Sequence, residues 1–289
     1  MKRAIFNQKG GVGKTSLTCN IAAAMADMGR KVLVVDLDSQ ANSSQYLLGT
    51  RYANITETIA DFFSSTLSFH LFRNSLAKTI IDTPFSGLSI VPADSRLKEL
   101  QPKLEGRYKI FKLREAIDTI IDESHYDEVL FDTPPALNFY SMSSLMAADS
   151  VLVPFDCDAF SAEAISQVSD AVKEVSLDHC PNLKIEGIVI NQFQGSARLP
   201  TQSIEQLKDE GYPIITPYIS SSIVMRESHS ASKPLVYFKP KHKVSHEFNE
   251  LANKLLNDQN KHHHSSPPAH KKSPTKGRRK IQQTKRAEL

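Results

Sequence analysis

The sequence is poor in residues that build covalent cross-links, metal clusters or membrane spans. It has no tryptophan and three cysteines in 289 residues. Cys19, Cys157 and Cys180 are far apart and odd in number, which excludes a disulfide framework and a C-x-x-C metal or redox pair. No apolar run approaches the roughly 18 residues that span a bilayer, and no signal peptide precedes the first apolar run. We therefore expect a soluble, cytoplasmic protein with no membrane partner.

Charge is distributed unevenly along the chain. The net charge is +3, and residues 258–289 contain nine lysines or arginines against two acidic residues, which leaves −4 for residues 1–257. This C-terminal stretch has almost no large apolar side chain, so it cannot bury enough surface to offset the entropy of ordering. We predict a folded domain over residues 1–256 and a basic, disordered tail over residues 257–289.

The folded part alternates between two hydrophobic patterns. Short apolar runs typical of buried strands alternate with stretches in which apolar residues recur at the helical period. This alternation predicts an α/β fold with a mostly parallel sheet flanked by helices on both faces, and the glycine-rich loop described below assigns it to the P-loop NTPase type. Residues 51–85 are hard to interpret: Ile59, Phe62 and Phe63 indicate a short helix, and Phe69, Leu71 and Phe72 belong to the core or to a partner surface. The expected strands cover residues 4–6, 32–35, 88–91, 129–131, 151–153 and 188–190.

The stretch RAIFNQKGGVGKTS, residues 3–16, indicates a phosphate-binding loop between a strand and a helix. Its glycines let the backbone turn N–H groups toward an anion, and the positive N-terminal end of the following helix adds to the attraction. Lys14 supplies a charge for the β- and γ-phosphates, and the Thr15 hydroxyl is placed for Mg²⁺. The expected nucleotide-binding set is Lys9, Gly10, Gly11, Val12, Gly13, Lys14, Thr15 and Ser16.

The loop departs from the usual spacing G-x-x-x-x-G-K-[ST]. Gln8 stands where the first glycine belongs, and a second cation, Lys9, directly precedes the glycines. By its chemistry alone, Lys9 could be a solvated lysine beside an anionic ligand.

Polar residues follow three of the predicted strands, where an open parallel sheet binds its ligands. Any single aspartate could be a helix cap or a turn former, but three strand ends on one edge indicate a site. Asp132 in LFDTPP fits a carboxylate that holds Mg²⁺, directly or through water. In VVDLDSQAN, Asp38 is the better candidate to orient the attacking water and joins the predicted metal site, whereas Asp36 is either an outer metal contact or structural. Asn191 ends the third strand.

The motifs KGGVGKT, DLDSQAN and FDTPP resemble those of the ParA/MinD family of deviant Walker-type ATPases, and the resemblance covers about residues 1–256. It implies an ATPase that uses ATP and Mg²⁺, with Lys9, Lys14 and Asp38 as catalytic residues. It also implies a homodimer in the ATP state, in which Lys9 reaches the partner's nucleotide. INQF and TPYIS resemble the segments that hold the adenine base, through Asn191 and Pro217, although a strand-end turn and an ordinary loop proline remain open. Ser39 replaces a proline common in the family, which removes no carboxylate.

Three branches of the family fit poorly. The tail lacks the bulky apolar residues of a MinD membrane helix, no paired cysteines could bridge an iron–sulfur cluster, and no helix-turn-helix domain precedes the loop. Among the branches of the family, the chain is therefore most similar to the small ParA/Soj-like ATPases. That resemblance implies nonspecific DNA binding on the nucleoid and a ParB-like or other cargo-linked protein that stimulates hydrolysis. The cargo would be a plasmid, a chromosome or a protein cluster.

The residues that would contact DNA are less well defined than the nucleotide site. Soj-like proteins carry arginines where this chain has Ser221 and Val224. Other cations could compensate, with a solvated charged face as the alternative, and the histidines at 262–264 fit a disordered polar tract better than a metal site. The DNA-binding candidates are Arg198, Arg226, Lys233 and Lys241, with further cations at Lys239, Lys243 and in the tail.

Two other functions are compatible with the motifs. A P-loop metabolic enzyme, such as an ATP-dependent ligase or kinase of related fold, would need a pocket for a second small substrate, and Lys9 would then act within one subunit. A MinD-like spatial regulator is the other alternative.

Overall fold

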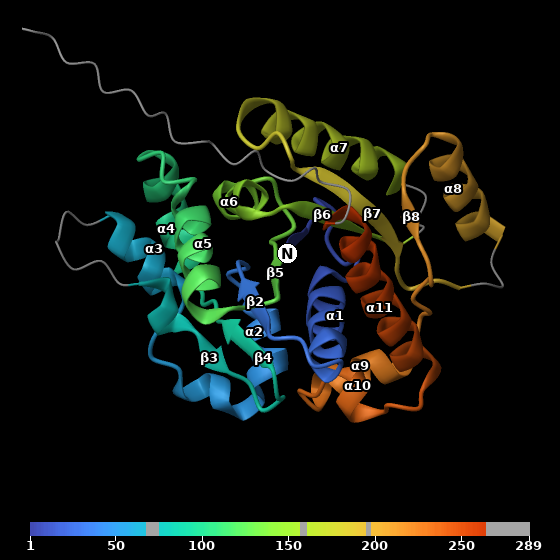
Figure 1. Cartoon of the computed structure of the whole chain (residues 1–289), viewed down its shortest axis with the longest axis horizontal. Helices are drawn as coiled ribbons and strands as arrows, with labels where there is room; N and C mark the ends of the chain where they lie inside the picture. Colours follow the sequence, from blue (N-terminus) through green and yellow to red (C-terminus); the bar gives the residue numbers. More distant parts are fainter. Residues whose placement is uncertain (68–74, 157–160, 195–197, 264–289) are drawn as a thin grey trace, which may run out of the picture.

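The computed structural model describes residues 1–67, 75–156, 161–194 and 198–263 as a sheet covered by helices on both faces (Figure 1). The strands are β1 (Lys2–Ile5), β2 (Val32–Asp36), β3 (Ile81–Asp82), β4 (Leu88–Val91), β5 (Glu128–Asp132), β6 (Ser150–Phe155), β7 (Lys184–Ile190) and β8 (Ile214–Ile215). The α-helices are α1 (Lys14–Asp27), α2 (Asn42–Leu48), α3 (Ile59–Leu67), α4 (Leu97–Glu105), α5 (Lys112–Ser124), α6 (Phe139–Ala147), α7 (Ser161–Asp178), α8 (Arg198–Asp209), α9 (Ile223–Ser230), α10 (Leu235–Phe238) and α11 (Lys243–His263). The described residues also form the 3₁₀ turns η1 (Gly49–Asn54) and η2 (Leu76–Thr79).

The strand order is β3-β4-β2-β5-β1-β6-β7-β8, and only the pairing of β3 with β4 is antiparallel among the described strands. The carboxyl ends of the parallel strands therefore meet at one edge of the sheet. In the register of β2 with β5, Asp36 lies beside Asp132. Two sequence segments about a hundred residues apart thus place their carboxylates next to each other.

Buried residues alternate between the two faces of the sheet. In β2, Val32 and Val34 pack with the core beneath α1 and α11, whereas Leu33 and Val35 pack with the core on the opposite face, to which α3 to α8 contribute. This period of two is the pleat of a strand that is buried on both sides. Helices α1 and α11 lie side by side over the sheet, which places the helix that follows the phosphate loop in the centre of the molecule (Figure 1).

A buried ion cluster ties the start of the chain to its last helix. Arg3 is fully buried, bonds Glu128 of β5 and Glu186 of β7, and donates to the carbonyl of Leu255 in α11 at 3.1 Å. A buried guanidinium is tolerated only where carboxylates and carbonyls satisfy it, as they do here. This cluster fixes β1, and with it the beginning of the phosphate loop, against α11.

The fold class predicted from the sequence is confirmed, and each expected strand has a counterpart, as does the short helix at Ile59. The predicted tail starts inside α11, which continues to His263, while residues 264–289 lie outside the described part, together with Phe69, Leu71, Phe72 and Cys157. The domain boundary at residue 256 stays a prediction. In the described residues, no helix is both long and apolar enough to cross a bilayer.

Candidate functional site

The loop between β1 and α1 has the geometry of a phosphate cradle. Gly13, the N-cap of α1, has φ +87°, a left-handed conformation that favours glycine. A Cβ at this position would lie 2.2 Å from the Asn191 Nδ2 atom. Both the dihedral angle and the close approach of Asn191 therefore require glycine here.

Two of the three side chains predicted to hold Mg²⁺, those of Thr15 and Asp132, come together at the carboxyl end of β5. The Thr15 hydroxyl donates to the Asp132 carboxylate at 2.7 Å, and the Ser43 hydroxyl of α2 donates to the same oxygen at 2.6 Å. Asp132 is fully buried, and desolvation raises its pKa, as does the negative charge of Asp38. Mg²⁺ prefers such hard oxygen donors and binds through one or two carboxylates together with substrate phosphates, so this donor set fits the ion.

Asp36 and Asp38 occupy different environments. Asp36 is fully buried, accepts hydrogen bonds from the Ser44 backbone N–H and hydroxyl at 2.9 and 2.7 Å, and also accepts one from the Asp38 N–H. Burial, followed by the charge of Asp132, raises the pKa of Asp36. Asp38 is only partly buried and accepts a hydrogen bond from the Gln40 N–H. The accessible carboxylate is thus Asp38, and Asp36 holds the α2 segment in place.

The two lysines of the loop point to different partners. Lys14 is 7 % exposed, and its Nζ donates to the carbonyl of Lys9 at 3.0 Å. Desolvation lowers the pKa of Lys14, while Asp132 and Asp38 oppose that effect. The Lys9 Nζ contacts both carboxylate oxygens of Asp156, at 2.8 and 2.9 Å. Lys9 is therefore paired within its own chain.

A cavity of about 790 Å³ opens beside the loop, within the size range of ligand sites. The carboxyl end of β7 contributes Asn191, which donates to the Val12 carbonyl, and Gln192, which donates to the Gly11 carbonyl, both at 2.9 Å. Pro217, which follows a cis peptide bond, is partly buried and is not among the described residues that line the cavity. The lining residues are Gly11, Gly13, Ser16, Asn191, Gln192, Ser220, Ser221, Ser222, Ile223, Met225, Arg226 and His229.

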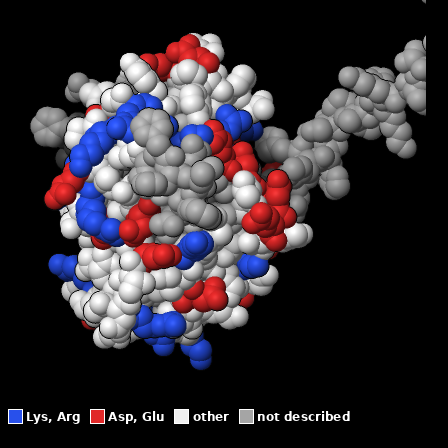
Figure 2. Space-filling view, turned by 90° about the vertical axis from the view of Figure 1, so that its left-hand side faces the viewer, with Lys and Arg blue, Asp and Glu red and all other residues white. Residues whose placement is uncertain are grey.

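In the described part of the chain, the predicted DNA contacts lie in different surroundings. Arg226 lines the cavity beside the phosphate loop, whereas Lys233 and Lys241 are exposed on either side of α10. Arg198 begins α8, and its side chain lies outside the described part. On the face formed by α3, α4 and their neighbours, cations gather along one edge with acidic residues beside them (Figure 2).

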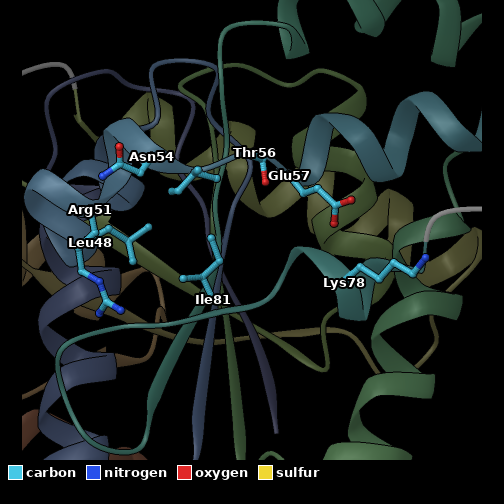
Figure 3. Close-up of a pocket in the computed structure, with 8 residues that line it drawn as sticks. Leu48, Arg51, Asn54, Thr56, Glu57, Lys78 and Ile81 are labelled. Atoms are coloured by element: carbon cyan, nitrogen blue, oxygen red, sulfur yellow. The ribbon is translucent and has the colours of Figure 1, made fainter.

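A second hollow of about 340 Å³ lies between η1 and η2 at the β3 edge of the sheet (Figure 3). Leu48, Ile55 and Ile81 contribute apolar side chains to its lining, and Arg51 and Lys78 contribute cations. Its described lining contains no residue of the phosphate loop, whereas Gly11, Gly13 and Ser16 line the larger cavity. We therefore expect the nucleotide at the larger cavity.

Asp156, Ser43, Gln192 and His229 were not predicted as site residues. Asp156 directly follows β6, so a search for polar residues at every strand end would have found it. Ser43 follows the DLDSQAN motif closely, but nothing in its spacing indicates the contact with Asp132. Gln192 and His229 reach the loop from segments about 180 and 215 residues away, and local sequence carries no signal for such contacts.

The chain was compared with known proteins. A family model described as an AAA domain matches residues 2–185. The chromosome partitioning protein ParA of Myxococcus xanthus is 32 % identical over 257 residues, which cover 87 % of this chain and 86 % of that protein.

Two solved structures are also similar. Cobyrinic acid a,c-diamide synthase from Mycobacterium smegmatis, with bound ADP and magnesium, has a TM-score of 0.75 at 23 % identity and covers 90 % of this chain and 96 % of its own. The cell division ATPase MinD from Pyrococcus furiosus has a TM-score of 0.71 at 25 % identity, and the match covers 88 % of this chain and 98 % of MinD. With the phosphate loop and the strand-end carboxylates, these matches show that the chain belongs to the ParA/MinD family of P-loop ATPases.

Proposed function

We propose that this ATPase forms an ATP-dependent homodimer, binds DNA without sequence preference, and hydrolyses ATP when a cargo-linked partner protein stimulates it. The observation that carries the proposal is the pair of lysines in one loop. Lys14 is buried at the phosphate cradle, whereas Lys9 lies at the rim, where its side chain is 25 % exposed. One loop thus offers a cation to its own nucleotide and a second cation to a ligand outside the cradle.

ATP and Mg²⁺ are the cofactors of this ATPase. In our proposal Lys14 contacts the β- and γ-phosphates, Thr15 and Asp132 hold the metal, and Asp38 orients the attacking water. The metal supplies charge neutralisation for the transferred phosphoryl group. The contact of Thr15 with Asp132 supports the metal assignment, and the accessibility of Asp38 supports its role.

Lys9 would change partners when two chains meet. In the single chain its ammonium is neutralised by Asp156. In the dimer it would leave Asp156 and contact the nucleotide of the partner, where a cation delivered in trans is worth roughly 10³ to 10⁵ in rate. The ion pair thereby keeps the cation away from the chain's own phosphates until the partner arrives.

DNA binding is supported by the exposed lysines and by the similarity to a protein named for chromosome partitioning. We assign DNA contact to Lys233 and Lys241, with contributions from Arg198 and from the basic tail. Binding to DNA would place the protein on the nucleoid. Each phosphate that these cations neutralise contributes about −0.9 to the log–log salt slope of binding to duplex DNA.

The diamide synthase does not favour a metabolic enzyme, because a likeness at 23 % identity extends only to the fold. A ligase would work with the nucleotide and its second substrate in one chain. Dimerisation is therefore the property that separates the two functions.

The test measures mass by sedimentation, with ATP analogue and with ADP, and then DNA affinity over a salt series. We expect dimers with the analogue only, DNA binding only by dimers, and a shallower salt slope for Lys233→Ala/Lys241→Ala and for a chain truncated after His263. A monomer that turns over ATP regardless of DNA would contradict the proposal.

A further inference from the structure

Helix α9 forms a wall of the nucleotide cavity, and one of its residues contacts the phosphate loop's helix directly. The His229 Nε2 atom lies 2.9 Å from the Ser16 hydroxyl. Ser16 is in the first turn of α1, and both residues line the cavity. The positive end of a helix attracts phosphate, so this hydrogen bond is made where the nucleotide's phosphate chain would lie.

The imidazole is held in place by more than this one contact. It stacks on the Tyr46 ring of α2, with centroids 3.9 Å apart and planes 13° from parallel. The Tyr46 hydroxyl is in turn bonded to Ser228 at 2.9 Å and to Asn20. The Asn20 amide donates to the Ser16 carbonyl at 2.9 Å. Helices α1, α2 and α9 thus orient the ring together.

The hydrogen bond between His229 and Ser16 is one that a neutral imidazole can make. Burial lowers the pKa of His229 below its ordinary value, so near neutral pH the ring carries one N–H and one acceptor nitrogen. Such a ring can take part in a hydrogen bond with Ser16 in either direction. A satisfied core histidine could also stack on a neighbouring ring, as His229 does on Tyr46, but it would not line a ligand cavity.

We propose that His229 is a positioning residue of the nucleotide site, which fixes the Ser16 hydroxyl at the start of α1 so that it is oriented toward the nucleotide's phosphates. Arg226, one helical turn earlier on α9, lines the same cavity and adds a cation to this wall. The inference rests on the proposed placement of the nucleotide. It assigns α9 to nucleotide binding rather than to DNA contact.

Two variants separate the parts of the interaction. His229→Phe keeps an aromatic ring for stacking on Tyr46 but cannot bond Ser16, whereas His229→Gln keeps a polar atom near the Nε2 position without the ring. Ser16→Ala removes the same bond from the other side. His246→Phe, at an exposed position of α11, is the matched control for the change of residue type.

The measurements are the dissociation constant of ATP, by titration calorimetry, and KM and kcat of ATP hydrolysis. We expect His229→Phe to weaken ATP binding about 3- to 10-fold, the usual effect of one lost hydrogen bond, and to raise KM with little change in kcat. His229→Gln should recover affinity to within about 2-fold of the parent. In the Ser16→Ala background, His229→Phe should have no further effect, because both changes remove one interaction.

Three results would overturn the inference: His229→Phe indistinguishable from His246→Phe, His229→Gln as weak as His229→Phe, or losses from Ser16→Ala and His229→Phe that multiply. If His229→Phe does not fold, His229→Leu, which also cannot bond Ser16, takes its place in the same comparisons, with His246→Leu as its control. Lys14→Ala distinguishes the two levels. If the Lys14→Ala variant still binds ATP, the proposed nucleotide site is wrong. If Lys14→Ala abolishes ATP binding but His229→Phe leaves the affinity for ATP unchanged, only the role of His229 is wrong.

Discussion

Replacing Asp156 by asparagine should tighten the ATP-dependent dimer. In the single chain, Lys9 makes two short contacts with the Asp156 carboxylate, whose side chain is 11 % exposed. If Lys9 must leave this carboxylate to reach the partner's nucleotide, the ion pair opposes dimerisation. Asparagine has nearly the same size but no charge, so it weakens the competing interaction without opening a cavity.

The expected size follows from the burial of the pair. Hydrogen bonds to charged groups contribute about 1.5–3 kcal/mol, and the partial exposure of Lys9 lowers this to about 1–2 kcal/mol. Two such pairs break for each dimer, so the dimer should gain about 2–4 kcal/mol. That gain corresponds to a dimer dissociation constant about 30- to 700-fold lower.

The assay is sedimentation of a concentration series with a non-hydrolysable ATP analogue, so that turnover does not deplete the dimer. Asp170→Asn is the matched control, because it removes the exposed partner of Lys173 on α7. The double variant Lys9→Ala/Asp156→Asn should dimerise no better than Lys9→Ala alone. An Asp156→Asn dimer that is equal to or weaker than the parent would refute the exchange of partners by Lys9.

Three further changes test other parts of the structure. Gly13→Ala should abolish ATP binding in calorimetry while circular dichroism stays native, because φ +87° and Asn191 leave no room for a Cβ; measurable ATP binding would contradict this. Asp38→Ala should leave ATP binding intact and accumulate a stable ATP dimer in sedimentation, and undiminished turnover would move the water-orienting role elsewhere. Arg3→Ala should lower the free energy of unfolding in urea by about 3–5 kcal/mol, because it leaves two carboxylates without their cation, and Arg3→Met should be as harmful unless those carboxylates become protonated.

The sequence predicted what depends on local pattern. The strand before the loop, the glycines, and the aspartates at the carboxyl ends of β2 and β5 can each be recognised from a few neighbouring residues. The rule for open parallel sheets then places them at one edge. Strand β3 was not predicted, because two residues carry no alternation that could be recognised. The extension of α11 to His263 was not predicted either, since its last residues lack the apolar period.

The contacts that orient the site were beyond the reach of local pattern. Lys9 with Asp156, and Ser16 with His229, join residues about 150 and 215 positions apart. Several carboxylates and imidazoles could lie next to a given loop residue. The order of the strands and the path that brings α9 to the start of α1 determine which of them does. Both follow from packing of the whole chain. The role of a loop residue was thus predictable from its type, whereas its partner was not.

The phosphate loop is held from outside in a way that prepares it for anions. The side-chain amide of Gln192 donates a hydrogen bond to the carbonyl of Gly11, and that of Asn191 donates one to the carbonyl of Val12. Because a trans peptide unit places its carbonyl and the following N–H on opposite sides, these bonds direct the N–H groups of Val12 and Gly13 away from β7. Donors fixed before the ligand arrives need no reorganisation when charge develops, which is the condition for strong electrostatic stabilisation. We therefore expect the carboxyl end of β7 to contribute to phosphate binding through the conformation of the loop, whether or not Asn191 also contacts the base.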